Sequence, residues 1–488
     1  MYKDFRKLFQ TSFIYGLGSI GGSIVGFFLL PIFTRFLHPA DYGILEILTT
    51  TSSIITIFLI FGMDNSFARF YFDSQTDEYK KQVISTTAIF LICLAGLVIP
   101  ILLIGSNFLN GFLFGQNNYT FLLQLVFLLS GLTAFFKVPM LLFRIKREAV
   151  KYSVISILNV LLVASLSIFF VVGLRKGVLG IMEGRTIAKI IILLVAYYLI
   201  RKDLSFEFSL NLLKEMLRYA IPIIPAGLML WILSLSDRYF LLKLADPVEL
   251  GLYSVGMRFA SILAIAIGAF RLGWGEFAFS RLNRNDKDKI YSRTFTYFIF
   301  VTCIIVLGLS LFGKEVVMLM TTQEYLRASS VIPILGLGLI FNGCYTIFGI
   351  GMNITKKMKA IFPITAIPAG LNLFLNYIFV PLYGMIGAAY TTLFSYFLMA
   401  ILTWYASQKV YPVQYEWKRV GKIFFAMGAI FVISKIITLD QLLFSIIFKF
   451  GLVGLYFLLL YLIKLPTNGE KEKIKYLFSK NIAFLRSK

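Results

Sequence analysis

Residues 11–36 read TSFIYGLGSIGGSIVGFFLLPIFTRF, an apolar stretch in which Arg35 is the one charged residue. About 20 such residues are enough to cross the hydrocarbon core of a bilayer, and backbone polar groups inside that core must be satisfied within the segment. The stretch is longer than the ~7–15-residue core of a secretory signal and lacks a small-residue cleavage site. It therefore predicts a retained membrane-spanning helix.

Similar stretches recur along the whole chain of 488 residues, which is 59% apolar with a mean hydropathy of +0.83. Ordinary soluble domains are roughly 45–50% apolar, so this composition indicates an all-α integral membrane protein. We expect about 14 transmembrane helices, near residues 11–34, 43–62, 83–104, 119–143, 152–172, 178–200, 218–242, 252–275, 294–312, 329–351, 360–380, 384–406, 420–438 and 441–463.

The formal net charge of +23 comes from short basic clusters between the apolar stretches. With these spans, 33 of the 47 Lys and Arg residues fall on the side of the N-terminus and 7 on the opposite side. Basic loops stay in the cytoplasm, so we expect both termini there in a multi-pass membrane protein. A nucleic-acid partner is not expected, because that would need a basic face on a polar fold.

Two segments suggest an internal duplication: RFLHPADYGILE at 35–46 and YFLLKLADPVELGLYSV at 239–255. Aligning Gly43 with Gly251 gives an offset of 208 residues. Aligning Gly180 with Gly387 gives 207, and aligning the basic loops at Lys151 and Lys359 gives 208. Since six spans separate the copies, the two halves would be parallel repeats around a central cavity that opens by alternating access.

The repeat predicts a six-helix lobe over residues 1–208, a second over 209–408, and two extra transmembrane helices over 409–464. A basic cytoplasmic tail follows at 465–488, with Ile474, Leu477 and Phe478 near helical spacing beside lysines. That tail is either an amphipathic helix on anionic membrane lipid or a solvated extension.

The opening GLGSIGGSIVGFFLLPIFTRFLHPADYGILEIL and the central LSDRYFLLKLADPVELGLYSVGMRF resemble polysaccharide-biosynthesis flippases of the Wzx type. These belong to the multidrug/oligosaccharidyl-lipid/polysaccharide exporter superfamily, and the resemblance covers essentially the whole chain. It implies two six-helix lobes plus two helices. It also implies a flippase that moves undecaprenyl-pyrophosphate-linked oligosaccharide from the inner to the outer leaflet, with membrane lipid and other polysaccharide-assembly proteins as partners.

Ionisable residues inside spans are costly and usually face a cavity or a partner. Basic ones outnumber acidic ones seven to three among those we identified, which suits an anionic cargo such as a pyrophosphate. The candidate substrate-binding residues are Arg185, Lys189, Arg258, Arg271 and Arg238. Asp237 and Glu183 are candidates for ion coupling or for a local ion pair, and such pairing is the alternative interpretation for the whole set.

Nothing in the sequence indicates a metal site, a cofactor or an enzyme. Cys93, Cys303 and Cys344 lie in separate apolar stretches, and His38 is the single histidine. No phosphate-binding glycine loop of the nucleotide-hydrolase kind is present, and the outer loops are short. Two alternatives to the flippase remain: a cation-coupled multidrug extruder of the same fold, and a membrane-embedded glycan polymerase or ligase.

Overall fold

The computed structural model describes residues 21–22, 24–73, 76–115, 118–205, 207–357, 360–437, 441–467 and 470. The first half of the first expected span and most of the basic tail lie outside these residues. Within them the chain forms helices and no strands, with these bounds: α2 (Leu30–Phe36), α3 (Pro39–Ile60), α4 (Met63–Tyr71), α5 (Asp77–Ile104), α6 (Ser106–Phe114), α7 (Thr120–Ile145), α8 (Ala149–Ile168), η1 (Phe169–Gly173), α9 (Gly177–Ile200), α10 (Leu210–Ala220), η2 (Ile221–Ile223), α11 (Ile224–Leu235), α12 (Asp237–Leu244), α13 (Pro247–Phe279), α14 (Lys287–Met320), η3 (Gln323–Ser330), α15 (Ile332–Phe348), α16 (Ile350–Ile354), α17 (Ile361–Val410), α18 (Trp417–Ile436) and α19 (Leu442–Leu462).

Among the described residues, ten helices are long and apolar enough to cross a membrane. One of them, α17, contains two expected spans, because the backbone turns at Gly384 with a left-handed φ of 53°. The remaining three expected spans correspond to the shorter apolar helix Ile24–Phe36, to α9 and to α18. Helices α9 and α18 are long enough to cross a membrane, but each carries several charged side chains and therefore lies outside these ten. The protein is a multi-pass membrane protein. The helices of the described residues account for the expected count of about 14 spans.

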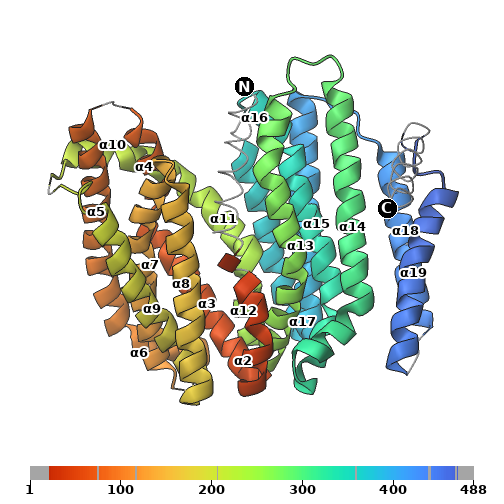
Figure 1. The fold of residues 1–488 in the computed structure, drawn as a ribbon, viewed down its shortest axis with the longest axis horizontal. Helices are drawn as coiled ribbons and strands as arrows, with labels where there is room; N and C mark the ends of the chain where they lie inside the picture. The colour runs from red at the N-terminus through yellow and green to blue at the C-terminus, as the bar shows by residue number, and fades with distance from the viewer. Residues whose placement is uncertain are drawn as a thin grey trace, which may run out of the picture.

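Proline breaks the seventh expected span into pieces. The segment runs through α10, the short 3₁₀ turn η2 at Pro222, α11 and α12. A proline removes a helical hydrogen bond and clashes with the preceding turn, so it kinks a helix. The kinked segment leads from the first lobe into the second, as the diagonal course of α11 shows (Figure 1).

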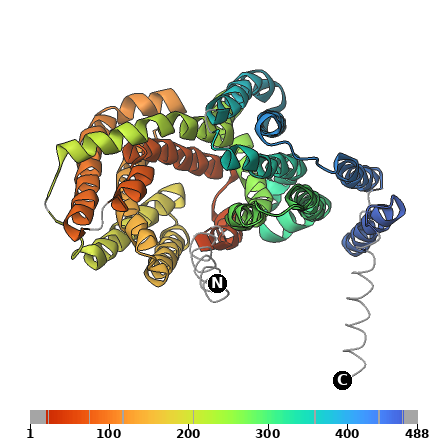
Figure 2. The same ribbon diagram turned by 90° about the horizontal axis from the view of Figure 1, so that it is seen from above.

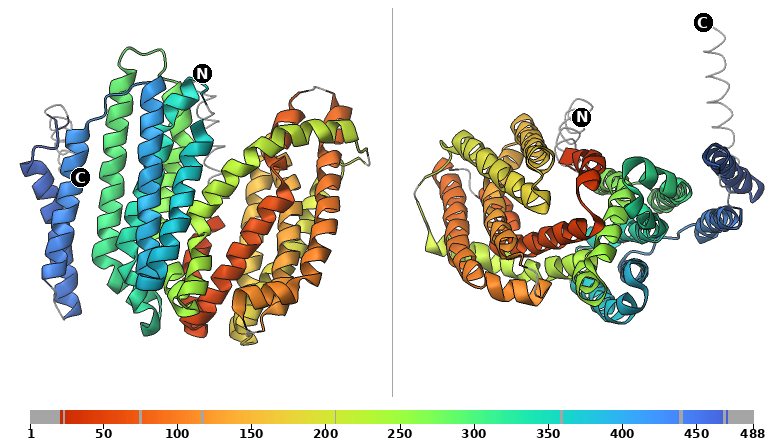
Figure 3. Two further views of the ribbon diagram at one scale, coloured as in Figure 1. Left: turned by 180° about the vertical axis from the view of Figure 1, so that it is seen from behind. Right: turned by 90° about the horizontal axis from the view of Figure 1, so that it is seen from below.

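The helices form two lobes side by side (Figure 1). Helices α3 to α10 make one lobe and α11 to α17 make the other, while α18 and α19 stand outside the second lobe, beyond α14 (Figures 1 and 2). Seen from behind, α3 and α11 run along the boundary between the lobes (Figure 3). This is the expected architecture of two six-helix lobes plus two helices. The lobe limits at residues 208 and 408 stay predictions.

Partly buried ion pairs join the two extra helices to the second lobe, through α14, and to each other. Lys449 of α19 forms an ion pair with Glu315 of α14. Arg419 of α18 pairs with Glu416 at 2.9 Å and with Glu470 at 2.8 Å. Partners of opposite charge offset the cost of placing ions in a low-dielectric environment.

Helices α3 and α13 cross in direct backbone contact. A Cβ atom on Gly43 would collide with the carbonyl oxygen of Pro247, and one on Gly251 would collide with that of Pro39. Gly43 and Gly251 are the pair that the 208-residue offset aligns, so equivalent points of the two lobes meet each other. Only glycine permits helices to approach so closely, because any side chain would have to occupy the partner's backbone.

The same repeat is visible in a second pair of close contacts. A Cβ atom on Gly180 of α9 would press on Phe170, and one on Gly387 of α17 would press on Phe379. Each glycine lets the sixth span of its lobe pack tightly against the fifth. The two glycine-based matches in the sequence therefore have a common structural cause in helix contact.

Near the crossing, the ends of the helices join the lobes on the side opposite the basic loops. The hydroxyl of Tyr325 in η3 donates to the carbonyl of Leu37 at 2.8 Å. His38 lies 3.0 Å from Glu324, and both side chains are exposed. Arg327 pairs with Glu249 at 2.7 Å within the second lobe. This side of the molecule is closed by contacts between the lobes.

Adding a methyl group at the crossing should destabilise the protein. We expect Gly43→Ala to lower the free energy of unfolding by about 1–3 kcal/mol, because the methyl group has no space unless the helices separate. Thermal unfolding of the purified protein in detergent would measure this. Gly428→Ala on α18 is the matched control, since its new methyl group would meet nothing within 4 Å. Equal stability of the two variants would contradict the close crossing.

The His38–Glu324 contact should depend on pH. The hydrogen bond that His38 donates to Glu324 and the negative charge of Glu324 raise the pKa of His38 above its ordinary value of 6.5. The stabilisation is therefore fully present below pH 6.5 and is lost as the pH rises through the raised pKa. We expect Glu324→Gln to lower the melting temperature more at about pH 5.5 than at about pH 8.5, by a small amount because the pair is exposed. The same difference in the His38→Gln background would show that another group is responsible.

A basic cavity between the lobes

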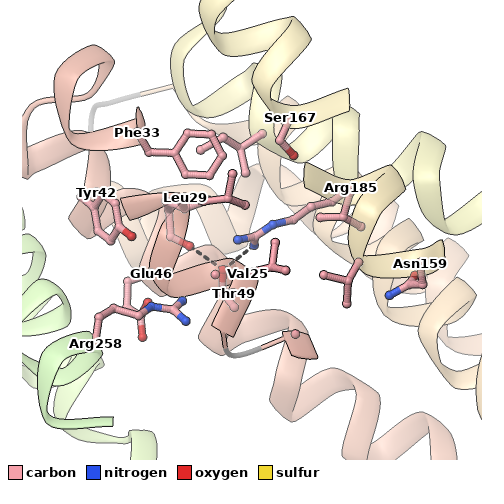
Figure 4. A pocket seen from close by; sticks show the side chains of 16 residues that line it. Val25, Leu29, Phe33, Tyr42, Glu46, Thr49, Asn159, Ser167, Arg185 and Arg258 are labelled. Carbon is pink, nitrogen blue, oxygen red and sulfur yellow. Dashed lines mark hydrogen bonds between the residues drawn. The ribbon is translucent and has the colours of Figure 1, made fainter. Parts of the chain in front are cut away.

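A cavity of about 200 Å³ lies beside the crossing of α3 and α13. Its walls come from the helix Ile24–Phe36, from α3, α8 and α9 of the first lobe, and from α13 of the second. About half of the lining surface is polar. The polar and charged side chains that line it are Tyr42, Glu46, Thr49, Asn159, Ser167, Arg185 and Arg258 (Figure 4).

Arg185 enters the cavity from α9. Its guanidinium Nη1 donates to the hydroxyl of Thr49 at 2.9 Å, and the structure gives it no ion pair among the described residues. Lys189 follows one turn later on the same face, as expected for positions i and i+4. Its ammonium donates to Asn159 at 3.0 Å and lies 4.4 Å from the centre of the Phe136 ring. Arg185 therefore lines the cavity, and Lys189 lies behind it, linked to the lining through Asn159.

Arg258 enters the same cavity from the second lobe. It lies seven residues after Gly251, so it is two turns along the face of α13 that crosses α3. A Cβ atom added to Gly26 would lie 3.8 Å from Nη1 of Arg258, so the guanidinium lies beside this glycine. Figure 4 shows Arg258 and Arg185 reaching from opposite lobes toward the space around Glu46 and Thr49. Two of the five candidate basic residues therefore meet in one cavity, one from each lobe.

Asp237 and Arg238 form a buried ion pair in the second lobe. Arg238 Nη1 lies 2.6 Å from Asp237 Oδ1, and the two side chains are 4% and 1% exposed. Tyr253 donates to the other carboxylate oxygen of Asp237, and Thr392 donates to the same oxygen at 3.3 Å. Asp237 is thus neutralised and bonded on both oxygens. This agrees with the ion-pair interpretation of Asp237, and Arg238 does not line the cavity.

Glu183 and Arg271 lie away from the cavity. Glu183 pairs with Lys176 at 2.7 Å near the start of α9. Arg271 is exposed, and its Nη2 donates to Asn342 at 3.2 Å. It lies 13 residues beyond Arg258, roughly 20 Å along a helix that rises about 1.5 Å per residue. The structure therefore separates these two candidates from Arg185 and Arg258.

The sequence interpretation overlooked Glu46, the one carboxylate among the described cavity-lining residues. Residue 46 lies inside the second expected span, so the cost of burying a charge there was a signal that could have found it. Tyr42, Thr49 and Asn159 are neutral, and nothing in their local sequence separates them from other polar residues of membrane helices.

These features define a class of protein: a multi-pass membrane protein with two repeated lobes and a charged cavity between them. The family model for polysaccharide biosynthesis proteins matches residues 8–270, more than half of the chain, and the MatE model matches residues 222–378. The chain belongs to the polysaccharide biosynthesis protein family.

Known proteins resemble the chain over most of its length. An uncharacterized membrane protein of Methanocaldococcus jannaschii is 21% identical over 470 residues, covering 90% of this chain and 91% of that protein. Among solved structures, the lipid II flippase MurJ in an inward closed conformation has a TM-score of 0.74 at 16% identity, covering 93% of this chain and all of that one. An inward-facing multidrug resistance MATE transporter has a TM-score of 0.66 at 15% identity, covering 82% of this chain and 94% of that one. At these identities the structural likeness establishes the fold.

Two arginines should respond differently to truncation. Arg238→Ala would leave the carboxylate of Asp237 buried without its cation, which typically costs 3–5 kcal/mol. Arg185→Ala removes a side chain whose partner is a neutral hydroxyl, so we expect about 1 kcal/mol or less. Thermal unfolding of both purified variants would measure the contrast. The double variant Asp237→Asn/Arg238→Gln replaces the ion pair by two neutral groups, so it should recover part of the stability that Arg238→Ala loses. Equal stability of Arg238→Ala and Arg185→Ala would contradict the assignment of Arg238 to a buried ion pair.

Proposed function

We propose that the protein is a flippase that exports undecaprenyl-pyrophosphate-linked oligosaccharide from the inner to the outer leaflet of a bacterial plasma membrane. The observation that carries the proposal is the meeting of Arg185 and Arg258, one from each lobe, in a single cavity. Two guanidinium groups face one carboxylate there, so the cavity has a net positive charge and suits an anionic headgroup.

The chemistry of a pyrophosphate fits these side chains. A planar guanidinium binds phosphate oxygens through two parallel hydrogen bonds, and such charge-assisted bonds are strong where water is scarce. Arg185 is held by a hydroxyl that a phosphate oxygen can replace as acceptor. Lys189, which donates to Asn159, adds a further positive charge behind the cavity wall that the first lobe forms.

Alternating access would expose the cavity to each side of the membrane in turn, and the membrane potential would set the direction of transport. The contacts at Gly43 and Gly251 close the side opposite the basic loops, and we infer that the basic loops and both termini are cytoplasmic. The cavity would then receive cargo from the inner leaflet. Each charge moved across 100 mV is worth about 2.3 kcal/mol, so an inside-negative potential favours export of the anionic headgroup.

The rival functions fit the cavity less well. A cation-coupled multidrug extruder needs acidic groups available to cationic drugs and ions, whereas Asp237 and Glu183 are engaged by Arg238 and Lys176. A glycan polymerase or ligase needs a catalytic acid or base beside the cargo, and Glu46 is the one carboxylate in the described lining. Other polysaccharide-assembly proteins would be partners on the flippase reading, supplying the lipid-linked glycan and consuming it.

The test is complementation combined with a leaflet assay. In a strain lacking its own oligosaccharide flippase, wild type should restore surface polysaccharide, and Arg185→Ala and Arg258→Ala should lower the export rate about ten- to a hundredfold. That range follows from losing a charged hydrogen bond of about 1.5–3 kcal/mol. Lipid-linked glycan on each leaflet and mature surface glycan would both be measured at equal expression.

Arg284→Ala is the matched control, since Arg284 lies in an exposed loop and pairs with Asp286. It should export like wild type. If well-expressed wild type moved none of several lipid-linked glycans of different structure, the result would contradict the glycan assignment and favour the multidrug extruder.

A further inference from the structure

Glu46 occupies a special place on α3. It lies three residues beyond Gly43, so it is on the face of α3 that crosses α13, one turn further toward the basic side. Its side chain is 14% exposed and lines the cavity with Arg185 and Arg258. The carboxylate therefore stands at the closed end of the cavity, where the two lobes touch.

Glu46 is held by charge more than by hydrogen bonds. Its Oε1 lies 3.6 Å from Nε of Arg238, beyond hydrogen-bond distance, and that Nε has no hydrogen-bond partner within the part of the chain that the structure describes. Arg238 already has Asp237 at 2.6 Å. Asp237 is thus the principal counter-ion of Arg238, while the Glu46 carboxylate, at the longer distance from Arg238, lines the same cavity as Arg185 and Arg258 and contributes its negative charge there.

The packing of the lobes does not require a carboxylate at this point. The 208-residue offset makes Ser254 the equivalent of Glu46 in the second lobe, and Thr50 the equivalent of Arg258 in the first. Ser254 is a neutral residue on the crossing helix, and its hydroxyl donates to the carbonyl of Leu250 in the same helix at 2.7 Å. The repeat explains the glycines of the crossing, whereas the opposite charges of Glu46 and Arg258 each belong to one lobe alone.

We propose that Glu46 is the internal counter-anion of the empty carrier, and that it competes with the anionic cargo for Arg258 and Arg185. This rests on the proposed function and names the residue that releases the cargo. In the empty carrier Glu46 offsets the charge of the arginines, which would otherwise be costly to keep in a low-dielectric cavity. When cargo is bound, the negative charges of the Glu46 carboxylate and the phosphate repel each other. This repulsion lowers the affinity of the carrier for its cargo and speeds the release of the cargo.

The proposal predicts a split between binding and turnover. Glu46→Gln removes the repulsion, so the purified full chain in nanodiscs should bind undecaprenyl pyrophosphate about tenfold more tightly. Turnover should fall, because cargo leaves slowly and the empty carrier returns with uncompensated arginines. Isothermal titration calorimetry would give the affinity. A leaflet assay in vesicles with labelled lipid-linked glycan would give KM and kcat, both of which should decrease.

The matched control is Ser254→Ala at the repeat-equivalent position, which should leave affinity and turnover as in wild type. A purely structural role for Glu46 predicts weaker binding and a lower melting temperature in Glu46→Gln, and that result would overturn the proposal, as would unchanged affinity. Should Glu46→Gln not be recovered folded, Glu46→Asp carries the test. Withdrawing the charge by one methylene should tighten binding by a smaller factor, and equal or weaker binding would overturn the proposal.

The wild-type arm separates this inference from the proposed function. Wild type that neither binds undecaprenyl pyrophosphate nor moves the labelled glycan would remove the flippase assignment and the inference with it. Wild type that does both, beside a Glu46→Gln variant that binds no more tightly, would leave the flippase assignment intact and remove the role of Glu46. Tighter binding of inorganic pyrophosphate by the same variant would place the competition at the phosphates, as the cavity geometry requires.

Discussion

The crossing of α3 and α13 is the contact on which the arrangement of the two lobes depends. Backbone meets backbone there, at Gly43 against Pro247 and at Gly251 against Pro39. A contact of this kind fixes the separation of the helices more tightly than interdigitated side chains could, because nothing in it can change rotamer. It also relates the lobes to each other, since each glycine meets the equivalent segment of the other copy.

The cavity owes its position to this crossing. Helices that touch at one point and diverge from it leave a space on the diverging side, and the side chains one or two turns from the crossing line that space. Glu46 is one turn from Gly43, and Arg258 is two turns from Gly251. The glycines are therefore shared between the repeats because they hold the lobes together, whereas the charged residues Glu46 and Arg258 differ between the repeats and line the cavity.

Much of the fold could be predicted from the sequence because membrane physics restricts it severely. Apolar length and the alternation of basic loops give the spans, and the 208-residue offset finds Gly43 and Gly251 because the constraint on them is steric and tolerates no substitute. The candidate site is less accessible to sequence reasoning. Arg185 and Arg258 share one cavity, whereas Arg271 and Glu183 satisfy the same rule of a charge within a span and lie elsewhere. A one-dimensional rule reports the cost of burying a charge, whereas the partner that offsets the cost is set by helix rotation and by segments far away in sequence. The pairing of Asp237 with its immediate neighbour is the case where sequence proximity was enough.

The bonds that join the lobes are weaker than the bonds inside the second lobe, and this difference is what a transporter requires. Asp237, Arg238, Tyr253 and Thr392 link α12, α13 and α17 through a buried charge pair with both carboxylate oxygens engaged. Across the boundary, α3 meets that unit through neutral hydrogen bonds, such as Thr51 with Tyr239 at 2.9 Å and Trp231 donating to Ser53 at 2.8 Å. Neutral bonds of this kind are worth about 0.5–1.5 kcal/mol each, whereas breaking a buried ion pair costs several. A movement that opens the closed side would therefore separate α3 from α11 and α12 and leave the second lobe intact. Among the described residues on this face of α3, such a movement would also have to overcome the ionic attraction between Glu46 and Arg238 of α12.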